Sequence, residues 1–125
     1  MTDEVSSAVE ELRTFFGELE VVEVEGGGAR VVIKEVYLGK QYEPSNSWIG
    51  FVVGFQYPRA EVYPHFVDGK LKRTDGKELG AGFSPQEWEK KSAIQVSRKS
   101  KAWDPLTDTA ATKLAQVLEW IGSLT

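Results

Sequence analysis

The residue types that most often perform covalent or metal chemistry are scarce in this sequence. It contains no cysteine and a single histidine, His65. The absence of cysteine excludes thiolate nucleophiles, disulfides and thiolate metal sites. One imidazole also argues against a zinc site, because structural and catalytic zinc ions take three or four protein ligands. We therefore expect no metal and no cofactor.

Two serines, Ser97 and Ser100, lie beside a basic run in the last third of the chain. A serine hydroxyl becomes a nucleophile when a neighbouring base takes its proton, and a histidine–acid pair is the usual arrangement. No such pair accompanies these serines in the sequence. His65 has no nucleophile near it along the chain, so we interpret it as a structural or surface residue rather than a general base.

The basic run consists of Arg98, Lys99 and Lys101, in a chain whose formal net charge is -4. This acidity argues against nucleic-acid binding and against attachment to an anionic membrane. A local basic segment can instead steer an acidic protein partner, because opposite charges raise the rate of association. A solvated turn without function is the alternative interpretation of the same residues.

Two segments near the ends of the chain have helical periodicity. Apolar residues recur at three- and four-residue spacing from Val5 to Phe16 and from Leu114 to Leu124. Asp3 can cap the first helix through its side-chain oxygen, and Thr107 or Asp108 can cap the second.

Strand-like segments lie between these helices. β-Branched and aromatic residues predict strands over Leu19–Glu25, Arg30–Leu38 and Trp48–Phe55, and a fourth strand after Pro64. Alternation of apolar and polar residues predicts a further short strand at 94–97. The glycines at 26–28 predict a turn rather than a phosphate-binding loop, because neither Lys-Ser/Thr nor a helix follows them.

The segment between the fourth strand and the short strand is irregular. Two Asp-Gly pairs predict a short hairpin that joins Leu71 to Leu79. The letters SPQE match a capping box with proline at the first helical position, which predicts a short helix from Ser84 to about Lys91. We expect Trp88, within this helix, to pack under the core rather than lie on the surface.

The order of these elements predicts one α+β domain over residues 1–125. It has an N-terminal helix, a four-stranded antiparallel meander, an irregular crossover with a short strand, and a C-terminal helix. No apolar run reaches the roughly 18 residues that a membrane span requires. The first residues lack a secretory signal, so we predict a cytoplasmic protein that does not bind membranes.

The spacing of one segment resembles the active-site region of ubiquitin-conjugating enzymes. In that family a strand with Ile-Cys-Leu precedes Trp-Ser-Pro at a fixed distance, and a helix follows. Here the letters IQV at 94–96 precede WDP at 103–105 with the same spacing, and a predicted helix follows. The resemblance places the family's catalytic cysteine on Gln95. It implies a UBC-like or RWD-like fold, closest to bacterial members of the superfamily, with Trp103 and Pro105 as structural residues.

Two catalytic features of that family are missing. The carboxamide of Gln95 cannot supply the thiolate that a thioester requires. The family's His-Pro-Asn, whose asparagine helps to stabilise the oxyanion, has no counterpart after Pro64. The order here is Pro64-His65-Phe66, and Asn46, the only asparagine, lies well upstream.

The resemblance implies a non-catalytic domain that binds a ubiquitin-like modifier or an enzyme of a conjugation pathway, as a monomer or a heteromer. We place its partner-binding surface around Gln95. The residues expected to contact the partner are Tyr57, Pro58, His65, Arg98, Lys99 and Lys101. One alternative is an RWD-like interaction module with no link to modifiers. Another is an active conjugating enzyme whose nucleophile at position 95 has been replaced.

Overall fold

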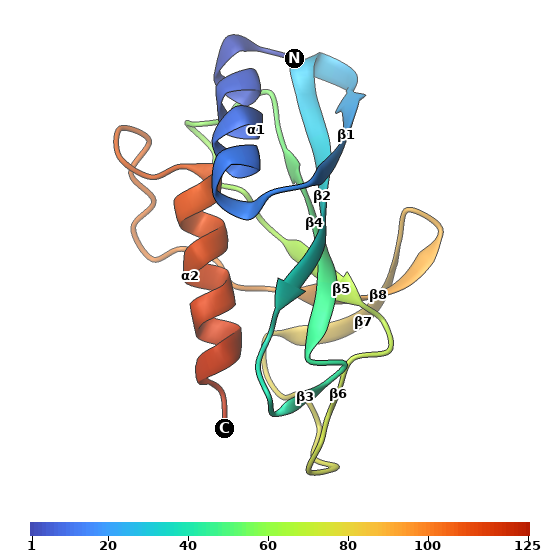
Figure 1. The fold of residues 1–125 in the computed structure, drawn as a ribbon. Coiled ribbons are helices and arrows are strands. Elements are labelled where there is room, and N and C mark those ends of the chain that lie inside the picture. The colour runs from blue at the N-terminus through green and yellow to red at the C-terminus, as the bar shows by residue number, and fades with distance from the viewer.

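The computed structural model, which describes residues 1–125, has two helices on one face of a six-stranded antiparallel sheet (Figure 1). The helices are α1 (Asp3–Phe16) and α2 (Ala110–Ser123). In spatial order, the strands are β1 (Leu19–Val24), β2 (Gly28–Tyr37), β4 (Asn46–Val53), β5 (His65–Asp68), β8 (Lys91–Val96) and β7 (Phe83–Trp88). A 3-10 turn, η1 (Glu25–Gly27), joins the first two strands. The predicted α+β class is confirmed, with the four-stranded meander β1-β2-β4-β5 and a helix at each end.

The first helix forms because its apolar residues recur at helical spacing and face the sheet. Its buried residues are Val5, Ala8, Val9 and Leu12. The hydroxyl of Thr2 accepts a hydrogen bond from the Val5 amide at 3.1 Å. Thr2 is therefore the cap, and Asp3 is already the first helical residue. The acidic side chain of Asp3 still favours the helix, because it lies at the positive end of the helix dipole.

The second helix begins one or two residues later than the predicted caps would place it. Its N-cap is Thr109, which forms a reciprocal capping box with Thr112. Thr107 and Asp108 belong instead to the turn that precedes the helix.

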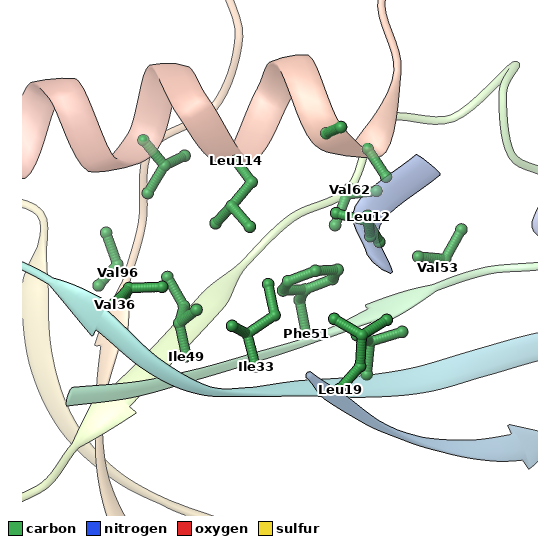
Figure 2. Close-up of a cluster of buried hydrophobic side chains, with 14 of the residues drawn as sticks. Leu12, Leu19, Ile33, Val36, Ile49, Phe51, Val53, Val62, Val96 and Leu114 are labelled. Atoms are coloured by element: carbon green, nitrogen blue, oxygen red, sulfur yellow. The ribbon is translucent and has the colours of Figure 1, made fainter. Parts of the chain in front are cut away.

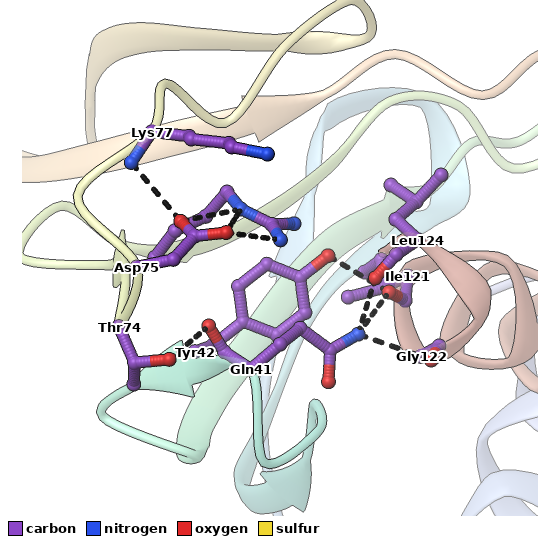
Figure 3. Close-up of polar contacts among 9 residues, drawn as sticks. Gln41, Tyr42, Thr74, Asp75, Lys77, Ile121, Gly122 and Leu124 are labelled. Atoms are coloured by element: carbon purple, nitrogen blue, oxygen red, sulfur yellow. Dashed lines mark hydrogen bonds and ion pairs between the residues drawn. The ribbon is translucent and has the colours of Figure 1, made fainter.

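The C-terminal end of α2 is held by the loop that contains β3 (Tyr42–Glu43). The side-chain amide of Gln41 donates to the carbonyl oxygens of Gly122 at 3.1 Å and Leu124 at 2.7 Å (Figure 3). The hydroxyl of Tyr42 donates to the carbonyl of Ile121 at 2.8 Å. These bonds satisfy carbonyl groups that have no partner within the helix, and they fix α2 against the sheet.

The core lies between the helices and the sheet. Leu12 of α1 and Leu114 of α2 are fully buried above Ile33 and Phe51, which point from the central strands toward the helices (Figure 2). Val96 of β8 lies in the same layer. The face of β8 that carries Val96 therefore belongs to the core, and its other face points away from the helices.

The predicted helix from residue 84 is wrong, because this segment is β7. It pairs with β8 through a two-residue turn, Glu89–Lys90, in which both residues have positive φ. Such turns match the twist of a hairpin. The local capping signal is overridden by cross-strand pairing and by the packing of Trp88. Pro85 is tolerated because β7 is an edge strand, where a missing amide donor costs no ladder bond.

The predicted hairpin from Leu71 to Leu79 is also wrong. β6 (Lys72–Arg73) pairs with β3, so its partner lies far away in the sequence. The carboxylate of Asp75 forms the turn after β6, since it accepts from the Arg73 guanidinium at 2.9 Å and from the Lys77 amide at 3.0 Å (Figure 3). Local side-chain bonds thus replace the expected strand pairing.

Neither helix has both the length and the apolar composition to cross a membrane.

Candidate functional site

Gln95 lies inside the sheet, on the strand β8. Its backbone is paired with Phe66 of β5 on one side and with Ser84 of β7 on the other. Its neighbours Ile94 and Val96 are buried on the helix side, so the Gln95 side chain points to the outer face. There its amide donates to the Ser97 hydroxyl at 3.0 Å. Gln95 is thus a half-buried carboxamide within a strand that is paired on both edges.

An aromatic stack covers the outer face beside Gln95. The ring of Trp88 stacks on Phe66 at 4.8 Å and on Trp48 at 6.0 Å, and the Lys91 ammonium lies 4.0 Å from the Trp48 ring. Trp88 therefore packs on the outer face, and the prediction that it packs under the core is wrong. It sits over Gly50, where an added Cβ would come within 2.2 Å of its ring.

The tip of the β7–β8 hairpin is fastened to the same face. Arg30 of β2 forms an ion pair with Glu89 in the turn at 2.7 Å. In Figure 1 this turn lies on the side of the sheet opposite to the helices. The hairpin thus bends over the outer face.

His65 lies on the other face of the sheet and is fully buried. Its ring contacts Phe51 at a centroid distance of 5.0 Å, and neither ring nitrogen has a hydrogen-bond partner. Burial, together with the charge of Lys113 and against an opposing effect of Glu61, lowers the pKa of His65 to about 3. The imidazole is therefore neutral at pH 7 and inaccessible. Burial removes His65 from any partner-binding surface, which corrects our prediction.

Tyr57 is also buried, at 7% exposure, and this corrects its predicted place on the rim of a binding surface. Its hydroxyl accepts the amide of Ala110, the first residue of α2, at 3.1 Å. Burial raises the pKa of the Tyr57 phenol. Tyr57 thus helps to hold the start of α2 and stays protonated.

Trp103 fastens the turn before α2 to the segment that contains Pro58. Its indole N–H donates to the Pro58 carbonyl at 2.7 Å, and its ring lies 6.5 Å from that of Tyr57. Trp103 is half-buried against the core, whereas Pro58 is partly exposed and Pro105 is exposed in the turn. The structural role expected for Trp103 thus has a physical basis in this contact, but Pro105 makes no comparable one.

The basic run forms an exposed loop between β8 and α2. Arg98, Lys99 and Lys101 take part in no ion pair. The guanidinium of Arg98 lies 5.2 Å from the Trp120 ring of α2, and the Lys99 ammonium lies 5.9 Å from the Tyr63 ring. This loop and α2 together line a groove of about 500 Å³. The loop therefore presents three unpaired cations beside a concave surface.

Sequence reasoning missed a buried polar cluster beneath this loop, which we call the Lys113 cluster (Lys113, Glu61, Ser100 and the Arg98 carbonyl). The Lys113 side chain is 2% exposed and that of Glu61 is 11% exposed. The Lys113 ammonium donates to a Glu61 carboxylate oxygen at 3.0 Å, to the Ser100 hydroxyl at 2.7 Å and to the Arg98 carbonyl at 2.7 Å. The Ser100 amide donates to the same Glu61 oxygen at 3.0 Å.

The Lys113 cluster also bears on whether Ser100 can act as a nucleophile. A lysine serves as a base only when it is neutral and has a free lone pair. Here Lys113 is paired with a carboxylate and donates all three of its N–H groups. Burial tends to raise the pKa of Glu61, but hydrogen bonds from Ser100 and Lys113 outweigh this effect and hold that pKa below its usual value. The arrangement is an ion pair with saturated donors, not an activated serine.

One signal in the sequence could have revealed this cluster. Lys113 lies on the apolar stripe of α2, between Ala110 and Val117, where a core-facing residue is expected. A charged residue at such a position is rarely buried without a partner. The partner itself, Glu61, could not be identified, because the Pro-rich segment that carries it has no periodic pattern.

Within residues 1–125, no group of three or more histidine, aspartate or glutamate side chains is arranged to hold a metal ion.

Comparison with known proteins identifies the family but no individual relative. The model of the family described as Prokaryotic E2 family E, where E2 denotes the ubiquitin-conjugating enzymes, matches residues 8–123. No curated protein and no solved structure shows a significant match to the chain. The family match covers nearly all of the chain and supports an E2-like fold. The chain belongs to Prokaryotic E2 family E.

Proposed function

We propose that this chain is a non-catalytic E2-like domain that binds a ubiquitin-like modifier or an enzyme of a modifier-conjugation pathway. The observation that carries the proposal is the state of position 95. An E2 enzyme needs a thiolate there, and Gln95 is a carboxamide in a chain without cysteine. Its backbone is paired with Phe66 and with Ser84. Family membership supports the pathway, and the residue chemistry supports the loss of catalysis.

The exposed basic loop supports a binding role. Arg98, Lys99 and Lys101 are unpaired cations in a chain of net charge -4, and they border the groove along α2. Their field attracts an acidic partner and chiefly raises the association rate. We therefore place the partner-binding surface on this loop and the adjoining groove, with Pro58 nearby. Gln95 can still donate to and accept from a peptide that reaches the outer face.

The test is a titration followed by NMR, with the isotope-labelled chain and a ubiquitin-like protein encoded beside its gene. We expect the amide signals of Arg98, Lys99, Lys101 and the groove residue Trp120 to shift together. Shifts confined to α1 or to the aromatic stack of the outer face would contradict this placement. A titration without shifts, repeated with each neighbouring modifier, would favour the RWD-like module.

Charge variants test the steering role of the loop. Serine at Arg98, Lys99 and Lys101 should lower the association rate constant about tenfold and flatten its dependence on salt. The matched control places serine at Lys70, Lys72 and Lys77, which are exposed on the segment around β6. Each triple variant changes the net charge from -4 to -7, since three positive charges are removed. An equal loss of rate in both variants would show a general charge effect and would contradict a specific surface.

A further inference from the structure

The Lys113 cluster joins three elements that are far apart in the sequence. Glu61 belongs to the segment between β4 and β5, Ser100 belongs to the basic loop, and Lys113 belongs to α2. The ion pair bridges 52 positions of the chain, and the bond from Lys113 to Arg98 bridges 15. The cluster therefore connects the basic loop both to α2 and to the segment between β4 and β5.

The bonds of the cluster fix the backbone of the loop and not only its side chains. Lys113 binds the carbonyl of Arg98, and Glu61 binds the amide of Ser100. The two peptide groups that flank Lys99, one on each side, are thereby fixed in position. A loop that is anchored at successive peptide groups loses much of its backbone freedom before any partner arrives.

Fixing the backbone also sets the directions of the exposed cations. From this anchored stretch, Arg98 extends toward the Trp120 ring and Lys99 extends toward the Tyr63 ring. The two charges thus lie beside rings from two different segments, α2 and the segment between β4 and β5. Side chains that are already held in their bound directions cost less entropy on binding.

A buried ion pair is a costly way to stabilise a fold. Removing two charges from water costs several kcal/mol for each ion. A protein in which well-packed apolar residues replace such a pair is often as stable or more stable. Lys113 occupies a core-facing position where leucine or methionine would fit the stripe of α2. Stability alone therefore does not account for Lys113 and Glu61, whereas a defined loop conformation does.

We propose that Lys113 is a positioning residue, which acts with Glu61 to hold the basic loop in its partner-binding conformation. The proposal rests on the proposed function for its consequence, the affinity for a partner. Its first claim, that the cluster orders the backbone of the loop, can be measured on the free chain without a partner. Ordering the loop should slow the dissociation of the partner, whereas the charges of the loop set its association.

The decisive variant combines Lys113→Met with Glu61→Leu. It removes one positive and one negative charge, so the net charge stays at -4 and electrostatic steering is preserved. It replaces the ion pair by apolar side chains, so the melting temperature should stay close to that of the unmodified chain. The Arg98 carbonyl and the Ser100 amide lose their partners, so the loop should become mobile.

The first readout is the NMR order parameter of the backbone amides of Arg98, Lys99 and Lys101 in the free chain. We expect values near 0.85, as for rigid backbone, in the unmodified chain and values below about 0.6 in the double variant. Unchanged order parameters in a folded double variant would overturn the proposal. This result does not depend on any partner, so it separates the failure of the proposal from the failure of the proposed function.

The second readout is binding to the ubiquitin-like protein of the titration above. We expect the dissociation rate constant to rise about 5- to 10-fold, with the association rate constant and its salt dependence unchanged. A purely structural ion pair would change neither rate constant once stability is restored. An unchanged dissociation rate would therefore overturn the positioning role.

A second variant keeps the test decisive if the double variant does not fold. Ser100→Ala removes one acceptor of Lys113 and leaves the ion pair and the other loop bonds in place. Its fold should be retained, because the loop is at the surface. The proposal predicts a smaller fall in the same order parameters and a 2- to 3-fold faster dissociation. Identical loop dynamics and dissociation in Ser100→Ala would contradict it.

Discussion

The two faces of the sheet differ in what covers them and in the chemistry that they hold. The inner face carries the core and His65 under α1 and α2, with the Lys113 cluster at the edge of that layer. The outer face carries Gln95 and an aromatic stack beneath the tip of the β7–β8 hairpin. Gln95 and Val96 are adjacent in the sequence yet belong to different faces, because residues alternate along a strand.

This difference shows how much a motif spacing that resembles a family's can predict about a site. The spacing from Gln95 to Trp103 locates a position along β8, but it carries no information about acids, bases or hydrogen-bond partners. The Lys113 cluster and the basic loop of this region lie toward the helix side. Gln95, where the resemblance places the nucleophile, lies on the other side, beside stacked aromatic rings.

Two tryptophans give the largest contrast between the faces. Trp103 contacts the core and donates to the Pro58 carbonyl, so Trp103→Ala should lower the free energy of unfolding by about 3 kcal/mol. Trp88 contributes stacking on an outer face that stays partly exposed, so Trp88→Ala should cost about 1.5 kcal/mol. Urea denaturation of both variants measures the difference. Equal losses, or a larger loss for Trp88→Ala, would show that the outer stack is as important as the core.

On the inner face, the buried His65 makes the stability of the fold depend on pH, an effect smaller than that of the tryptophans. Its pKa in the folded chain is about 3, against an ordinary value of 6.5. Between these values the unfolded chain binds more protons, so stability falls as the pH is lowered through this range, by about 1.4 kcal/mol per pH unit. The lowered pKa of Glu61 acts in the same direction, but only below its ordinary value of 4.5. The window from pH 6.5 to pH 5 therefore reports on His65.

His65→Leu tests this assignment. It removes a polar ring with two unpaired nitrogens from a fully buried position and keeps a similar volume. Stability at pH 7 should be unchanged or slightly higher, because no hydrogen bond is lost. The slope of stability between pH 6.5 and pH 5 should fall by about 1.4 kcal/mol per unit. If thermal melts at several pH values gave the same slope as the unmodified chain, another group would be responsible.

The elements with periodic burial could be predicted from the sequence. Both helices and the meander follow from apolar residues that recur with the period of a helix or a strand, because one face of each element is buried in a common core. The β7–β8 hairpin could not, since the letters SPQE form a valid local helix signal. What decides its structure is the stacking of Trp88 on Phe66 and Trp48, which lie on other strands. Contacts between distant segments overrode the local preference.

The candidate site was predicted in part for the same reason. The strand that carries Gln95 and the polar basic loop after it are local features, and the structure has a strand and an exposed loop there. The burial of His65 and Tyr57 depends on how the segment between β4 and β5 packs under α2, and that segment has no repeating pattern. The pairing of Lys113 with Glu61 joins residues 52 positions apart. Only the charge of Lys113 on an apolar stripe pointed to it.

The central claim, that this E2-like domain forms no covalent link with a modifier, is tested most directly by intact mass spectrometry. The chain is incubated with ATP, a ubiquitin-like protein encoded beside its gene and the matching activating enzyme. Formation of a thioester on the activating enzyme serves as the positive control. We predict that the mass of the chain remains unchanged, because Gln95 and the saturated Lys113 cluster supply no activated nucleophile. A species heavier by the modifier less one water would contradict the account.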